Sequence, residues 1–164
     1  MTGLPCSGKT TIAKKLQEHI HNLAVLDGDE LREWLSPKDF SMEGRIEHNN
    51  KVARLAKLLI THKVPVCVSL ISPYRENRQN ACTVIGKQQF VEVYVKCCID
   101  VCEQRDVKEW YKKARRNEIK HLTGVSDVYE IPDNPDLVID SENLSSSESV
   151  KAILSFIKEK GYYE

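Results

Sequence analysis

Apolar side chains recur along this chain in two alternating patterns. In the first, large aliphatic residues lie three or four positions apart, as at Ile12, Leu16 and Ile20, and this spacing predicts amphipathic helices. In the second, short runs of β-branched and other apolar residues are bounded by turn residues, and such runs predict buried strands. The expected helices cover 9–21, 28–35, 43–64, a segment from Pro73 to about 85, 100–104 and 108–116, with a last one that carries Val150, Ile153, Leu154 and Ile157. The expected strands cover 24–27, 66–71, 91–96 and 137–140.

Strands that alternate with helices indicate a parallel sheet that is covered on both faces. The fold class we expect is therefore α/β, with three layers (α/β/α) in a single domain over residues 1–164. One segment, at about 107–135, is polar and basic and contains Gly124, Pro132 and Pro135. Because a long polar loop in a compact domain usually serves a site, we expect this segment to be a mobile lid.

Composition narrows the range of functions. The 164 residues include 24 Lys+Arg and 24 Asp+Glu, so the formal net charge is zero. This balance argues against nucleic acid and anionic membranes as partners, and the longest apolar run, at 64–71, is too short to span a bilayer. The six cysteines form no C-x-x-C pair, which argues against a metal cluster and favours a reducing, cytoplasmic compartment. We therefore expect a small-molecule site.

The strongest motif is a phosphate-binding loop at the start of the chain. Residues 3–10, Gly-Leu-Pro-Cys-Ser-Gly-Lys-Thr, match G-x-x-x-x-G-K-[ST] at every fixed position. Its glycines let backbone N–H groups converge on phosphates, Lys9 can reach the β- and γ-phosphates, and the Thr10 hydroxyl can bind Mg²⁺. The alternative is a glycine-rich turn with a solvated lysine, but a predicted helix begins where the motif requires one. The fold class thus becomes that of a P-loop NTPase.

A phosphate-binding loop normally follows a buried strand, and only Met1 and Thr2 precede Gly3 here. This strand is therefore expected to be truncated or missing. Three explanations remain open: the strand lies upstream of this sequence, the domain does without it, or another segment or chain takes its place.

A second cluster of candidate residues follows the strand at 24–27. Asp27 and Asp29 lie just beyond its end, where ligands bind in open α/β sheets, and Arg32 follows one helical turn later. A carboxylate there can accept a hydroxyl proton or help to hold Mg²⁺, and Arg32 can pair with an anion. The alternative reading of these acids is a cap for the helix at 28–35. Ser72, at the end of another strand, is by itself more typical of a turn.

At this point the chain resembles the adenylylsulfate kinase (APS kinase) family of P-loop kinases along almost its whole length. The segments that carry the resemblance are GLPCSGKTT from Gly3, LDGDELR from Leu26, FS at Phe40, LISPYRENR from Leu70, VCEQRDVKEWYKKAR from Val101, EIKHLTGVSDVYE from Glu118 and NPDLVID from Asn134. Members of this family use MgATP to phosphorylate the ribose 3′-hydroxyl of adenosine 5′-phosphosulfate (APS), which gives 3′-phosphoadenosine 5′-phosphosulfate (PAPS) and ADP. The resemblance implies this activity, with ATP and Mg²⁺ as cofactors.

The resemblance also implies site residues. The catalytic set is Lys9, Asp27, Asp29 and Ser72, with Thr10 and Asp27 toward the metal. The ATP-binding set is Gly3, Leu4, Pro5, Cys6, Ser7, Gly8, Lys9, Thr10, Thr11, Arg105 and Arg115. The APS-binding set is Asp29, Arg32, Phe40, Arg45, His48, Ile71, Ser72, Lys108, Lys120, His121 and Leu122. Because in-line phosphoryl transfer needs only positioning and charge neutralisation, we expect Ser72 to contact the substrate and not to become phosphorylated.

The chain departs from the family pattern at three positions. His48 replaces an expected Asn, Asn50 replaces an Arg, and Leu122 stands where an aromatic residue usually covers the adenine. These changes concern affinity and substrate discrimination. We therefore expect Leu122→Phe to lower the KM for APS.

Two other functions stay open at this stage. The chain could be a P-loop kinase for another nucleotide or small hydroxyl compound, which His48 and Leu122 favour, or a non-catalytic nucleotide-binding module, which the missing strand favours. Against the module, Lys9, Thr10, Asp27 and Arg32 are all present. The family resemblance further implies a homodimer, and a separate ATP sulfurylase that supplies APS in sulfate assimilation.

Overall fold

Parallel strands and flanking helices build the protein in the computed structural model, which describes residues 1–35 and 39–162. The helices of this described part are α1 (Lys9–Gln17), α2 (Gly28–Leu35), α3 (Met42–Thr61), α4 (Arg75–Ile85), α5 (Ile99–Arg105), α6 (Trp110–Arg115) and α7 (Ser146–Glu159), with a 3₁₀ turn, η1 (Lys87–Gln89). Its strands are β1 (Ala24–Asp27), β2 (Val66–Ser69), β3 (Val93–Lys96) and β4 (Leu137–Asp140). Every expected helix and strand is present, and most are a few residues shorter than the sequence pattern suggests.

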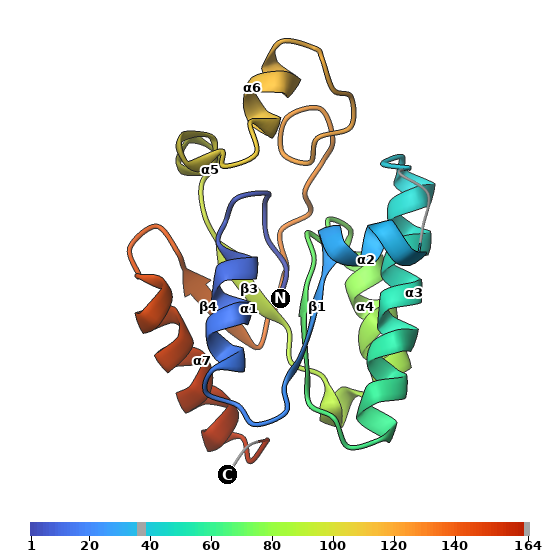
Figure 1. Ribbon diagram of the computed structural model, residues 1–164, viewed down its shortest axis with the longest axis vertical. Coiled ribbons are helices and arrows are strands. Elements are labelled where there is room, and N and C mark those ends of the chain that lie inside the picture. The colour runs from blue at the N-terminus through green and yellow to red at the C-terminus, as the bar shows by residue number, and fades with distance from the viewer. Residues whose placement is uncertain (36–38, 163–164) are drawn as a thin grey trace.

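The sheet is parallel, as the alternation predicted. β1 pairs with β2 in the register Ala24↔Val66, and β3 pairs with β4 in the register Val93↔Leu137. Figure 1 shows the N-terminus in the space between these two pairs. Residues 1–3 therefore lie where the strand before the phosphate-binding loop is expected.

Hydrogen bonds from residues 1–3 join the two halves of the sheet. The Met1 amine donates to the Val68 carbonyl at 2.7 Å, and the Thr2 N–H donates to the Val93 carbonyl at 2.9 Å. The Val95 N–H in turn donates to the Thr2 carbonyl at 2.9 Å, which makes Thr2 a single parallel bridge to Tyr94. Among the described residues, 1–3 therefore lie in the place of this strand, and Thr2 forms the bridge.

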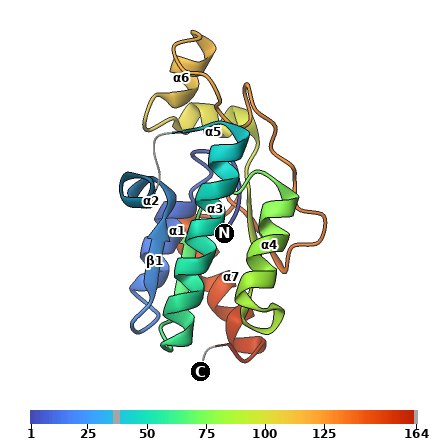
Figure 2. The ribbon, with the colours of Figure 1, turned by 90° about the vertical axis from the view of Figure 1, so that its right-hand side faces the viewer.

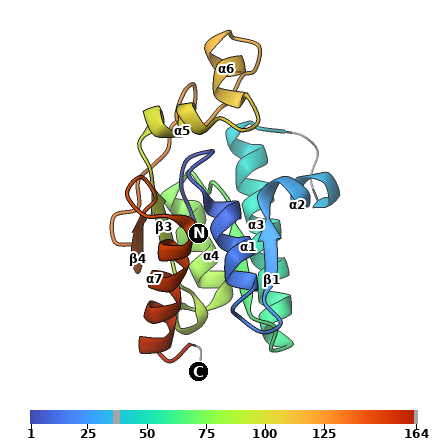
Figure 3. The ribbon, with the colours of Figure 1, turned by 60° about the vertical axis from the view of Figure 1, so that its left-hand side comes forward.

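Two helical layers cover the sheet. α1 packs against α7 on one face, and Figure 3 shows these two helices side by side. α3 packs against α4 on the other face, which Figure 2 brings to the front. The apolar stripes that predicted the helices face inward, and Ile12, Leu16 and Ile153 lie in one core cluster with Val95 and Ile139 of the strands. A second cluster, around Leu26, Val52 and Ala56, fills the layer beneath α3.

The segment that was expected to form a lid is folded and packed over the carboxyl ends of the strands (Figure 1). We call residues 107–127 the cap. It contains α6, whose Tyr111 and Ala114 share a small apolar cluster with Cys97, Cys102 and Leu122. The Asp106 carboxylate accepts hydrogen bonds from the N–H groups of Tyr111 and Lys112 at 3.1 and 3.0 Å, and so caps the start of α6. The cap therefore covers this edge of the sheet and shares a small apolar core with α5 and the residue that follows β3.

Candidate functional site

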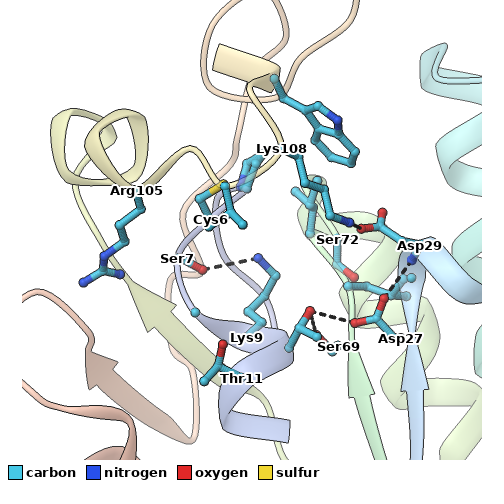
Figure 4. Close-up of a pocket in the computed structure, with 18 of the residues that line it drawn as sticks. Cys6, Ser7, Lys9, Thr11, Asp27, Asp29, Ser69, Ser72, Arg105 and Lys108 are labelled. Carbon is cyan, nitrogen blue, oxygen red and sulfur yellow. Dashed lines mark hydrogen bonds and ion pairs between the residues drawn. The ribbon is translucent and has the colours of Figure 1, made fainter. Parts of the chain in front are cut away.

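One large cavity, of about 1140 Å³, opens at the carboxyl ends of the strands between the phosphate-binding loop, α2, the corner at 70–73 and the cap. Figure 4 shows this cavity with Lys9, Asp27, Ser72 and Lys108 facing it from different elements. The cavity brings together most of the residues that were expected to bind ligands: Pro5, Cys6, Ser7, Gly8, Lys9, Thr10, Thr11, Asp27, Asp29, Arg32, Phe40, Arg45, His48, Ile71, Ser72, Arg105, Lys108, Lys120, His121 and Leu122. Segments more than 100 residues apart in the chain thus meet at one site.

Three expected residues do not line the cavity. Gly3 lies at the base of the loop, where an added Cβ would lie 2.5 Å from the Val95 carbonyl oxygen, so no larger residue fits there. Leu4 packs on the apolar cluster below the cap. Arg115 points away and forms an exposed ion pair with Glu103.

The phosphate-binding loop is held in shape by its own lysine. Gly8 has φ 99°, a left-handed conformation that favours glycine, and it starts α1. The Lys9 ammonium donates to the carbonyls of Gly3 and Leu4 at 2.9 and 2.7 Å and to the Ser7 hydroxyl at 3.2 Å (Figure 4). Burial of this ammonium lowers the pKa of Lys9 to about 8. The lysine thus lies inside the loop, with its ammonium bound to oxygens of the loop itself.

Asp27 joins the loop to α2. One of its carboxylate oxygens accepts the Thr10 hydroxyl at 2.7 Å, and the other accepts the N–H of Asp29 at 3.0 Å. The Ser69 hydroxyl lies 3.5 Å from that of Thr10, so three oxygen-bearing side chains from α1, β1 and β2 converge. Asp27 therefore caps the first turn of α2 and also faces the cavity, and its role toward a hydroxyl proton or Mg²⁺ stays a prediction.

The opposite side of the cavity is cationic and aromatic. The Arg32 and Arg45 guanidinium groups lie 4.8 and 5.7 Å from the centre of the Phe40 ring, which is 37% exposed. Arg45 is buried, donates to the Phe40 carbonyl at 3.0 Å and approaches Asp127 of the cap at 3.7 Å. Such an arrangement can stack on a flat ring and pair with an anion.

His48 lies behind this surface on α3. It is 1% exposed, and burial together with the nearby Arg32 charge lowers its pKa to about 4. The imidazole is therefore neutral at physiological pH, so it faces the cavity as a hydrogen-bonding group without charge.

The cap contributes residues from above. The Lys108 ammonium forms an ion pair with Asp29 and lies 5.1 Å from the centre of the Trp110 ring (Figure 4). Lys120 and His121 line the cavity from the exposed part of the cap. Leu122 lines it too, although it is only 5% exposed and packs in the apolar cluster.

The corner at Ile71 and Ser72 completes the cavity. Ser72 has φ 44°, which is strained for a residue with a side chain, and its carbonyl accepts a hydrogen bond from Arg78 at 2.7 Å. The Thr2 hydroxyl donates to the Ile71 carbonyl at 2.7 Å. Sequence reasoning missed Thr2, Ser69 and Arg78. A hydroxyl at a strand end could have indicated Ser69, whereas only the fold reveals the other two.

The chain was compared with known proteins and matches the family model for adenylylsulphate kinase over residues 1–140. It is 40% identical to an adenylyl-sulfate kinase of Oceanobacillus iheyensis, a match that covers 98% of this chain and 83% of the relative. It is 43% identical to a probable adenylyl-sulfate kinase of Halalkalibacterium halodurans, with 97% and 79% covered.

Solved structures that resemble this fold also include APS kinases. The APS kinase of Mycobacterium tuberculosis, in complex with AMPPNP and APS, superposes with a TM-score of 0.90 and 36% identity, over 96% of this chain and 94% of that one. A hexameric APS kinase from Thiobacillus denitrificans gives a TM-score of 0.73 and 25% identity, over 99% of this chain and 29% of that one.

Proposed function

The chain belongs to the adenylylsulphate kinase family, and we infer that it transfers the γ-phosphate of ATP to APS, giving PAPS and ADP. One feature of the site supports this function above all. A single cavity is lined by a phosphate-binding loop and also by an aromatic ring that two guanidinium groups approach. It therefore suits two nucleotides, with the γ-phosphate of one next to the ribose of the other.

The loop is the proposed ATP side. Its backbone N–H groups and the N-terminus of α1 favour a polyphosphate, and Lys9 leaves the Gly3 and Leu4 carbonyls to neutralise the β- and γ-phosphates. Arg105 lines the same cavity and is proposed to approach the nucleotide. Phosphoryl transfer needs little covalent chemistry from the protein, so positioning and charge are the main contributions of these groups.

The residues present also fit Mg²⁺. The Thr10 hydroxyl and the Asp27 carboxylate, 2.7 Å apart, are the hard oxygen donors that Mg²⁺ takes, and this ion needs only one or two protein ligands beside phosphate oxygens and water. We propose that Thr10 and Asp27 hold it. Bound with ATP, the ion supplies further neutralisation of charge on the phosphates.

The aromatic and cationic side is the proposed APS side. Phe40 stacks on the adenine, Arg32 and Arg45 pair with the phosphosulfate, and Ile71 and Ser72 border the ribose. Asp27, with Asp29 beside it, is the proposed acceptor of the proton of the 3′-hydroxyl as that oxygen attacks the γ-phosphate. Ser72 is proposed to contact substrate in a direct in-line transfer.

Several finer features belong to the same proposal. The residues at about 107–135 act as a lid whose Lys108 and Lys120 reach both nucleotides, and closure excludes water from the transferred group. The proposed location is the cytoplasm, and six free thiols support a reducing compartment. The protein is further proposed to work as a homodimer, with a separate ATP sulfurylase that supplies APS for sulfate assimilation. No helix in the described residues is long and apolar enough to cross a membrane.

The test is ADP release from MgATP with APS, AMP or gluconate as the acceptor, followed by ³¹P NMR of the product. We expect turnover with APS and a new phosphate on the 3′-oxygen. Turnover with another acceptor and not with APS would show a kinase of different specificity. Tight ATP binding without turnover on any acceptor would show a nucleotide-binding module.

A further inference from the structure

The guanidinium group of Arg78, on α4, lies behind the APS side of the cavity and is the centre of a buried network. Arg78 is 6% exposed. Its Nη1 donates to the Ser72 carbonyl at 2.7 Å, its Nη2 donates to the Glu130 carbonyl at 2.7 Å, and its Nε lies 2.8 Å from the Glu92 carboxylate. One side chain thus joins the corner at 71–73, the chain segment that follows the cap, and the chain just before β3.

The corner depends on this network because its conformation is strained. Ser72 has φ 44°, and such a backbone persists only when its surroundings hold it. The Thr2 hydroxyl holds the Ile71 carbonyl at 2.7 Å, and Arg78 holds the next carbonyl, that of Ser72. Both carbonyls are thus bound by groups behind the corner, and this fixes how the residues of the corner face the cavity.

The same guanidinium also holds the segment that follows the cap, through the Glu130 carbonyl. The Glu130 N–H donates to the Pro73 carbonyl at 2.8 Å, while the Glu130 carbonyl accepts from Arg78. Arg78 also lies 6.0 Å from the centre of the Tyr129 ring, whose hydroxyl is 2.9 Å from that of Thr2. The corner and the end of the lid segment are therefore held together by Arg78 and its neighbours.

We propose that Arg78 is a positioning residue for the acceptor: it holds Ser72 in the conformation that receives the APS ribose and couples this corner to the segment that follows the cap. The inference deepens the proposed function and rests on it. Arg78 does not line the cavity, so it acts through Ser72 and Glu130 and not by contact with the substrate.

Arg78→Lys is the main test. Lysine keeps the positive charge beside Glu92, but its single ammonium cannot replace the two guanidinium nitrogens that donate to the Ser72 and Glu130 carbonyls. Arg75→Lys is the matched control. Arg75 lies on the same helix, and its guanidinium donates to the Ile131 carbonyl and pairs with Asp133 of the same segment. The Ser72 and Glu130 carbonyls accept from Arg78 instead. We expect Arg78→Lys to raise the KM for APS about tenfold and to change the KM for ATP less than twofold. The control should change neither constant by more than twofold.

Three results would overturn the proposal: an unchanged KM for APS, an equal rise in both constants, or the same change in the control. If Arg78→Lys does not fold, the double variant Arg78→Met, Glu92→Gln removes both members of the Arg78–Glu92 pair and is judged by the same comparison.

Hydrogen exchange separates this inference from the proposed function. We expect the Glu130 amide to exchange at least tenfold faster in Arg78→Lys than in Arg75→Lys, with no substrate present. Equal exchange rates overturn the coupling even if the enzyme phosphorylates APS. If the wild-type protein does not use APS, the proposed function fails, and the exchange rates still decide whether Arg78 couples the two segments.

Discussion

Lys9 shows how burial sets the properties of a single residue at this site. Its ammonium lies among carbonyl and hydroxyl oxygens that carry no full charge, and burial lowers its pKa to about 8. Phosphate groups favour the charged form, so ATP raises this pKa, and binding at pH 8 takes up about half a proton. Calorimetry in two buffers of different ionisation enthalpy measures the uptake. It should be near zero at pH 6.5 and absent in Lys9→Met, and no uptake by the wild type at pH 8 would contradict the prediction.

His48 gives a second prediction, on stability. Its pKa is about 4 in the fold and about 6.5 in an unfolded chain, so the unfolded state binds more protons between these values. The contribution of neutral His48 is fully present above pH 6.5 and is lost as the pH falls toward 4. Urea unfolding should show that His48→Asn loses about 2–3 kcal/mol less free energy of unfolding between pH 7 and pH 4 than the wild type. Equal losses in both proteins would contradict this.

Some residues of the site could be predicted from the sequence alone, and others could not. Lys9, Thr10, Asp27 and Arg32 were predicted because their chemistry depends on neighbours in the chain, such as a loop motif or a strand end. Arg78 could not be predicted in this way, since its partners at 72, 92 and 130 become neighbours only through the fold.

At the scale of elements, hydrophobic periodicity predicted the helices and strands but not how the cap is built. The segment at 107–127 has few apolar residues, and those it has, such as Tyr111 and Leu122, pack against Cys97 and Cys102 of another segment. A local pattern cannot show such packing. For the same reason Leu122 was considered only as a departure from the family, at a position where an aromatic residue usually covers the adenine. Leu122 is in fact a core residue of the cap, so Leu122→Phe must fit a larger ring among these neighbours.

α6 carries a prediction of its own. Asp106 caps this short helix, and Tyr111 on α6 donates its hydroxyl to the Pro5 carbonyl of the phosphate-binding loop at 3.0 Å. We expect Asp106→Ala to lower the free energy of unfolding by about 1–2 kcal/mol and to raise the KM for ATP, because the loop loses its support from α6. Glu109→Ala removes only an exposed 3.4 Å pair with Lys112 and should stay within about 0.5 kcal/mol of the wild type. Equal effects of the two variants in thermal unfolding and steady-state kinetics would contradict this role for Asp106.

At the scale of the whole molecule, the net charge is zero, and charged side chains of the cap pair with oppositely charged side chains of the rest of the protein. Lys108 of the cap pairs with Asp29, and Asp127 of the cap approaches Arg45. The proposed function assigns Lys108, Asp29 and Arg45 to the two nucleotides. Substrate binding must therefore exchange ion pairs within the protein for ion pairs with ligand phosphates, and the cap is the part of the molecule that has to adjust.

This exchange predicts a change in dynamics that is confined to the cap. Exposed ion pairs such as Lys108–Asp29 contribute little stability to the contact between the cap and the body. We propose that MgADP and APS together bridge the cap and the body, so the two ligands should protect the cap. Hydrogen-exchange mass spectrometry should show amides of 107–127 exchanging at least tenfold more slowly with both ligands than without. Amides of β4, whose Ile139 is 1% exposed, serve as the internal control and should change little. Equal protection of the cap and β4 would indicate global stabilisation by ligand, and an unprotected cap would contradict its role as a lid.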